Sequence, residues 1–197
     1  VHHTSTQGKL IQYYGSHSQG GLVGTAISSD ISYSASHMDF VNSNGTVLGN
    51  DIRSIGGFIG TAENSRIKDV YADGNIDYFT FIHTNIVVGE IAGLVGTMSN
   101  SFFSNAYYAG KIAISSNLIT PVANLGGAIG ISTNSVVENI FWDTEVSGVS
   151  VSSGGIGKKT AQMKKKALWN NAGFDPHFWL VRNGSYPKLV GVDDNNA

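Results

Sequence analysis

The chain has 197 residues, a formal net charge of −2 and no cysteine. This length suits one domain or one elongated module with a buried core, and the lack of cysteine excludes a disulfide framework and a thiolate metal site. No run of about 18 apolar residues occurs, which argues against membrane insertion, and the slightly negative charge gives no general attraction to nucleic acid.

The composition predicts an all-β protein. The chain contains 18 Ile and 17 Val but only 9 Leu, and β-branched residues favour strands. Hydrophobic residues make up 41% of the sequence, which argues against disorder, whereas charged residues make up only 13%. We therefore expect a folded protein whose surface is covered largely by Ser, Thr, Asn and Gly.

A pentapeptide of the form Gly-Gly-apolar-apolar-Gly occurs four times along the chain. Its copies occupy residues 20–24, 56–60, 92–96 (with Ala92 first) and 126–130. Their second residues are spaced by 36, 36 and 34 positions. Such a period indicates a repeat architecture in which each unit buries its apolar face only by stacking on its neighbours.

Further positions recur with the same period. A threonine recurs at Thr25, Thr61 and Thr97. An Asn-Ser pair recurs at residues 64–65, 100–101 and 134–135. An aromatic residue recurs at Tyr71, Tyr107 and Phe141, which we call the aromatic file. Short apolar stretches alternate with Gly, Asn and Ser, which favour turns. The pattern predicts a β-solenoid (β-helix) of about four 36-residue repeats, with Asn at repeated corners able to form ladders. One long coil or two shorter coils per repeat both fit, and a propeller is the main alternative.

The C-terminal segment, residues 158–197, differs from the repeats. Residues 1–157 carry 5 basic and 11 acidic groups, whereas residues 158–197 carry 7 basic and 3 acidic groups. We therefore divide the chain into a repeat region, 1–157, and a C-terminal capping segment, 158–197. In this segment Thr160 can cap a short helix with Met163, Ala167 and Leu168 on its apolar face, and a hairpin-like tail follows Gly173. We expect the segment to cover the last coil, because an open solenoid end exposes unpaired strand edges.

The repeats resemble the GLUG motif of bacterial surface and secreted proteins. The resemblance extends through an ordered terminal series: residues 139–148 (NIFWDTEVSG), 154–157 (GGIG), 160–163 (TAQM), Trp179 and 186–189 (YPKL). It covers roughly residues 20–190. It implies an adhesin of the filamentous-haemagglutinin kind, or a protein related to the repeats found near immunoglobulin A proteases. The sequence has no His-Glu-x-x-His, so no peptidase activity carries over.

Carboxylates could serve a carbohydrate-active enzyme, because some β-solenoids carry paired acids. The candidates are Asp143 with Glu145, and Asp69, Asp73 and Asp77. We interpret Asp69, Asp73 and Asp77 as solvated corner acids. Asp143 and Glu145 fit the terminal series of the GLUG resemblance, which implies no catalytic role for them. The six histidines show no ligand spacing, and we expect no metal and no cofactor. Five lysines could hold an anionic glycan or phospholipid head, but we prefer a solvated helix face as their explanation: Lys158, Lys159, Lys164, Lys165 and Lys166.

Aromatic residues crowd the terminal part of the chain. Trp142, Trp169, Trp179 and Tyr186 are the candidates for stacking on sugar rings, and the alternative is that they dock the C-terminal segment. We expect a non-catalytic module of an exported, extracellular surface protein, acting as adhesin stalk, display or adhesive module. A carbohydrate-binding module is the second hypothesis and a carbohydrate-active enzyme the third. The expected partners are surface glycans, a host or neighbour-cell protein, and further domains of a longer parent chain. We expect such a parent chain because residues 1–7 look like a cut made inside a longer protein and show no signal peptide.

Overall fold

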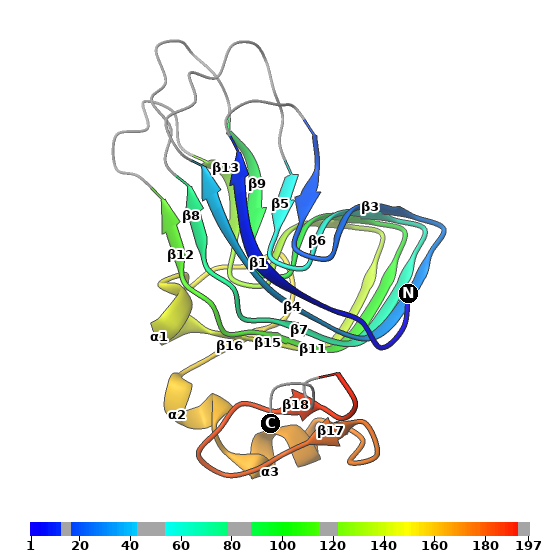
Figure 1. Cartoon of the computed structure of the whole chain (residues 1–197), viewed down its shortest axis with the longest axis vertical. Helices are drawn as coiled ribbons and strands as arrows, with labels where there is room; N and C mark the ends of the chain where they lie inside the picture. The colour runs from blue at the N-terminus through cyan, green and yellow to red at the C-terminus, as the bar shows by residue number, and fades with distance from the viewer. Residues whose placement is uncertain (13–16, 43–53, 79–87, 115–121, 193–197) are drawn as a thin grey trace.

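The computed structural model describes residues 1–12, 17–42, 54–78, 88–114 and 122–192. Within these ranges the chain forms eighteen strands and three short helices, and every strand pairing is parallel except one hairpin. The prediction of an all-β protein is confirmed. Figure 1 shows the strands curling together around a common interior.

Two four-stranded parallel sheets flank the pentapeptides. The first sheet holds the strands that precede each pentapeptide or end within it: β2 (Gln19–Gly20), β5 (Ser54–Gly56), β9 (Val88–Ala92) and β13 (Val122–Gly126). The second holds the strands that follow: β3 (Val23–Ile27), β6 (Ile59–Glu63), β10 (Val95–Ser99) and β14 (Ile129–Thr133). Each pentapeptide is therefore the corner between these two sheets.

The third sheet is larger and has eight strands. They are β1 (Ser5–Gln12), β4 (Asp30–Asn42), β7 (Arg66–Ala72), β8 (Ile76–Tyr78), β11 (Phe102–Tyr108), β12 (Ile112–Ile114), β15 (Val136–Asp143) and β16 (Ile156–Lys158). The long strand β4 pairs with β1 and, along successive parts of its length, with β7 and β8.

The strand register follows the sequence period. Thr25 pairs with Thr61, Thr61 with Thr97, and Thr97 with Ile131, at offsets of 36, 36 and 34 residues. Equivalent positions of successive repeats thus lie side by side, so each repeat builds on the one before it.

In the repeated Asn-Ser pair, the asparagine forms the turn and the serine forms hydrogen bonds between repeats. Asn64, Asn100 and Asn134 adopt left-handed backbone angles, with φ of 49°, 47° and 49°, which Asn tolerates better than most residues. The serines form the ladder: the Ser65 amide donates to Ser101 Oγ at 3.0 Å, and the Ser101 amide donates to Ser135 Oγ at 3.0 Å. A second ladder joins Asn139 to Asn105 and Asn105 to Asp69, each at 3.2 Å.

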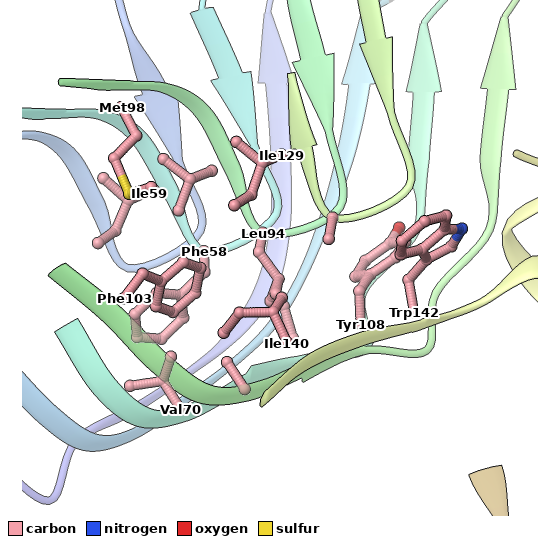
Figure 2. Packing of buried hydrophobic residues seen from close by; sticks show 14 of the residues in the cluster. Phe58, Ile59, Val70, Leu94, Met98, Phe103, Tyr108, Ile129, Ile140 and Trp142 are labelled. Atoms are coloured by element: carbon pink, nitrogen blue, oxygen red, sulfur yellow. The ribbon is translucent and has the colours of Figure 1, made fainter. Parts of the chain in front are cut away.

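Apolar side chains fill the interior between the three sheets. Figure 2 shows ten of them, contributed by strands and corners of several repeats: Phe58, Ile59, Val70, Leu94, Met98, Phe103, Tyr108, Ile129, Ile140 and Trp142. All are at most 5% exposed. Burial of these side chains is the main source of stability for the sheets.

Short elements follow β15; the first helix precedes the C-terminal segment and the others lie within it. Thr144–Ser147 (α1), Thr160–Met163 (α2) and Lys166–Asn171 (α3) are helices, and β17 (Trp179–Leu180) pairs with β18 (Lys188–Leu189) in an antiparallel hairpin. The single helix expected from Thr160 onward is wrong, because the chain breaks between α2 and α3. Met163 is buried as expected, whereas Ala167 is exposed.

The segment packs against the outer face of the eight-stranded sheet (Figure 1). A second apolar cluster joins the two, with sheet residues Ala35, Tyr71, Tyr107 and Phe141 against segment residues Met163, Trp169, Phe174, Trp179, Leu189 and Val192. The aromatic file of the repeats is therefore the docking surface of the segment. The segment covers the face of the sheet across β4, β7, β11 and β15, so the expectation that it covers the last coil is wrong. The division of the chain at residue 157 stays a prediction.

Candidate functional site

The three tryptophans predicted as sugar-stacking candidates are buried, Trp142 between the sheets and the other two where the C-terminal segment packs on the eight-stranded sheet. Trp142, Trp169 and Trp179 are 5%, 0% and 1% exposed. Their indole N–H groups donate inward, to the carbonyls of Val149 (2.8 Å) and Met163 (2.7 Å) and to Asp69 Oδ1 (3.0 Å), respectively. Burial leaves no indole face open to a sugar, so these residues make no surface platform.

Trp169 and Trp179 instead fix the C-terminal segment to the sheet. Trp169 lies 5.4 Å from Tyr107 and 5.5 Å from Phe141, measured between ring centroids. Trp179 lies 6.2 Å from Tyr71. These contacts are those expected from the docking alternative.

Tyr186 is the one aromatic candidate that is only half-buried. Its hydroxyl donates to Asp143 Oδ2 at 2.6 Å, and its ring stacks on Tyr107 with 6.0 Å between centroids. Burial, followed by the hydrogen bond to Asp143, raises the pKa of the Tyr186 phenol well above its ordinary value. Tyr186 is thus a neutral, firmly held side chain.

The carboxylate of Asp143 holds several parts of the segment together. Its Oδ1 accepts the amide N–H groups of Glu145 (2.9 Å) and Val146 (3.0 Å) and the hydroxyl of Thr160 (3.0 Å). Its Oδ2 accepts the Tyr186 hydroxyl. Asp143 is fully buried, and this arrangement caps α1 and ties α2 and Tyr186 to the end of β15.

A groove of about 330 Å³ lies between the C-terminal segment and the eight-stranded sheet. We call it the tail groove. Its lining includes two tyrosines, three cations and one carboxylate: Tyr107, Tyr186, Lys164, Arg182, Lys188 and Asp73. Tyr186 is therefore the one predicted aromatic candidate in the lining, beside the predicted Lys164 and Asp73.

Aromatic rings position two of the cations. The Lys164 ammonium lies 5.1 Å from the centroid of the Tyr186 ring. The Lys188 ammonium lies 5.4 Å from the Tyr71 centroid and 3.4 Å from its hydroxyl oxygen. Asp73 is engaged at 2.6 Å by His37 Nδ1. In the part of the chain that the structure describes, Lys164, Arg182 and Lys188 form no salt bridge with a carboxylate, so the groove has an excess of positive charge.

The other acidic candidates form no open pair. Glu145 is exposed, and its carboxylate accepts the Thr160 amide at 3.0 Å, whereas the neighbouring Asp143 is buried. Asp69 accepts hydrogen bonds from Trp179 and Asn105, Asp73 pairs with His37, and Asp77 is exposed. Asp143 binds four donors and therefore serves the fold. Among the described residues there is no group of three His, Asp or Glu side chains that could hold a metal ion.

Sequence reasoning missed Arg182 and Lys188 as groove residues. Arg182 follows Val181 and Lys188 precedes Leu189. The spacing of these two residues from the lysines at 158–166 shows no period. The only hint was the alternation of aromatic and basic residues between 178 and 189. Of the five predicted lysines, Lys164 lines the tail groove.

Comparison with known proteins points to the same motif as the repeats. A protein of Evansella cellulosilytica named "Putative Gly-rich membrane protein" is 33% identical over 104 residues, which is 50% of this chain and 12% of that relative. No solved structure matches the chain. No helix in the described ranges is long and apolar enough to cross a membrane. Residues 53–77 match the family model of the GLUG motif, and the protein is accordingly one that carries the GLUG motif, as its repeats indicate.

Proposed function

We propose that this chain is a non-catalytic repeat module of an exported bacterial surface protein. In this proposal the repeats are the stacked coils of a β-solenoid, and each parallel sheet is formed by equivalent strands of successive coils. The single observation that carries the proposal is the register. Thr25, Thr61 and Thr97 occupy one file across neighbouring strands, and each lies 36 residues after the one before. In a solenoid of this kind about four repeats form a stiff module that holds an attached binding surface away from the cell.

The GLUG motif and the printed name of the Evansella relative support a surface location. Adhesin stalk, display or direct adhesion are the roles we assign to the module, with surface glycans or a protein of a host or neighbouring cell as partner. The parent chain would supply further domains.

The arrangement of acids supports a non-catalytic role. Glycoside hydrolysis uses two carboxylates that flank one bond, roughly 5 to 9 Å apart. Among the residues that the structure describes, Asp73 is the one carboxylate that lines the tail groove. Neither Asp143, which is saturated with donors, nor Asp69, which is buried under Trp179, is open to a substrate.

The surface location is tested by labelling cells that produce the full parent protein with an antibody against this module. We expect intact cells to be labelled as strongly as permeabilised cells, with a cytoplasmic protein as the negative control. Labelling that requires permeabilisation would contradict the proposal.

A carbohydrate-binding module is the second candidate. The observation that favours it is the tail groove, which combines a half-buried tyrosine with several polar side chains in one hollow. From the sequence alone, the tryptophans and Tyr186 are the candidates for stacking on the sugar. In this candidate function the tryptophans are buried, and Tyr186 and its charged neighbours would contact the sugar.

A further inference from the structure

We infer that the tail groove binds an acidic saccharide, whose carboxylate or sulfate groups are held by Lys164, Arg182 and Lys188. The inference rests on the carbohydrate-binding candidate and names its ligand class. It does not depend on the role as a display module.

Three separate parts of the segment bring the cations together. Lys164 directly follows α2, Arg182 follows β17, and Lys188 begins β18. Two hydrogen bonds fix these parts to each other. The Gly184 amide donates to the Lys164 carbonyl at 2.8 Å, and the Lys166 amide donates to Asn183 Oδ1 at 2.9 Å. The turn at residues 182–186 is therefore held against the junction of α2 and α3.

The walls of the groove are rigid. Tyr107 donates its hydroxyl to the Pro187 carbonyl at 2.6 Å, which joins strand β11 to the residue before Lys188. Tyr186 is held between Asp143, Tyr107 and the Lys164 ammonium. A site that is already ordered loses less entropy when a ligand binds, so affinity improves without further contacts.

The charges in the groove are available to a ligand. The Lys164 and Lys188 ammonium groups lie over tyrosine rings and are not paired with carboxylates in the described structure. An ammonium group above a ring keeps its full charge and its N–H donors. Arg182 is exposed and forms no hydrogen bond or ion pair with any described residue. Its planar guanidinium can bind a carboxylate or sulfate through two parallel hydrogen bonds.

The shape and extent of the groove favour a saccharide over other polyanions. Its volume of about 330 Å³ lies near the lower limit of small-molecule pockets, roughly 300 Å³. Nucleic acid is bound by basic patches or stripes that contact many phosphates, whereas here three cations line one hollow of a chain with net charge −2. A lipid surface calls for a broad apolar or basic face that can lie flat on the membrane. Leu180 is the one large exposed apolar side chain among the residues that line this groove.

Isothermal titration calorimetry on the full chain tests the inference with three probes. They are a heparin hexasaccharide (sulfated), an oligogalacturonate of similar length (carboxylated) and a neutral cello-oligosaccharide. We expect at least one acidic probe to bind, with an affinity that falls as NaCl is raised, and the neutral probe not to bind. The acidic probe that binds identifies the anionic group.

Paired substitutions locate the binding site. Arg182→Gln with Lys188→Gln removes two groove cations, and we expect the affinity to fall roughly tenfold or more, because charge-assisted hydrogen bonds to the anionic group are lost. Lys165→Gln with Lys166→Gln makes the same change in net charge on neighbouring exposed residues that do not line the groove. We expect this control to retain affinity within about threefold, since only long-range attraction is lost. Circular dichroism checks that both variants fold.

Several outcomes would overturn the inference. Absence of binding by both acidic probes would do so while leaving the surface-labelling result intact, and equal losses in the two variants would show a diffuse charge effect. Tighter binding of a short DNA duplex or of vesicles containing phosphatidylserine, with the same dependence on Arg182 and Lys188, would replace the saccharide with that ligand class.

Discussion

Single small residues of the repeats allow neighbouring repeats to approach each other closely. At Gly93 a Cβ atom would collide with the ring of Tyr108 and with the backbone carbonyl of Gly127, and at Gly127 it would collide with the indole of Trp142. The pentapeptide glycines thus leave room for the large aromatic residues that fill the interior beside the corners. The backbone at these positions is ordinary, and the constraint is space.

We predict that Gly93→Val lowers the free energy of unfolding by at least about 2 kcal/mol, because the added side chain forces the Tyr108 ring and a neighbouring corner apart. Urea denaturation followed by circular dichroism measures the change. Ala123→Val is the matched control, because Ala123 is exposed in β13 and its added methyl groups meet no core, so we expect a change within about 0.5 kcal/mol. An unchanged midpoint for Gly93→Val would refute the packing role of the glycine.

The sequence also indicates which residues repeat, but not how deeply each one is buried. The recurrence of Tyr71, Tyr107 and Phe141 is visible in the sequence, but it fits a stacked core and a surface ladder equally. The residues form a ladder on the outer face of the sheet, and the C-terminal segment then buries them. Burial of Trp169 and Trp179 depends on the same long-range docking, which no local pattern reveals.

At the scale of elements, the C-terminal segment and the eight-stranded sheet complete each other. The segment has short helices and one two-stranded hairpin, which are too small to be stable alone. Its apolar side chains cover the aromatic file, so docking buries apolar surface of both the segment and the sheet.

We predict that removal of residues 158–197 causes self-association, because it uncovers Tyr71, Tyr107 and Phe141 as one apolar patch. Sedimentation velocity measures the association. The matched control is Trp169→Ala with Trp179→Ala in the full chain, which weakens docking without deleting the segment and should associate less. A truncated chain that stays folded and monomeric would show that the segment protects nothing.

The prediction of one helix failed because other donors occupy two backbone carbonyls that a continuous helix would need. Residues 160–171 have the composition of one amphipathic helix, yet the carbonyl of Met163 accepts the indole N–H of Trp169 at 2.7 Å. The Lys164 carbonyl accepts the amide of Gly184. Both acceptors are thereby taken by tertiary contacts, and the chain forms two short helices where sequence periodicity predicts one.

At the scale of the whole molecule, the repeat period decides the arrangement of the sheets. Offsets of 36, 36 and 34 residues in the sequence reappear as the register of parallel strands. This part could be predicted, because stacking is the only way such short units bury their apolar faces. The tail groove could not be predicted, because Lys164, Arg182 and Lys188 meet only after the segment folds back on the sheet.

The most direct test of the account is whether equivalent positions of successive repeats lie side by side. The chain has no cysteine, so an introduced pair is the only one present. Ile27 and Glu63 are exposed register partners in β3 and β6, and partners in adjacent strands lie about 4.8 Å apart, within the reach of a disulfide. The control pair, Ile27→Cys with Thr61→Cys, is two residues out of register and roughly 7 to 8 Å apart.

Mild oxidation followed by mass spectrometry of proteolytic fragments reports which pair forms a disulfide within one molecule. The stacked arrangement predicts fast, near-complete bonding for Ile27→Cys with Glu63→Cys and slow, partial bonding for the control. Preferential bonding of the control pair, or failure of the register pair to bond in a folded chain, would contradict it.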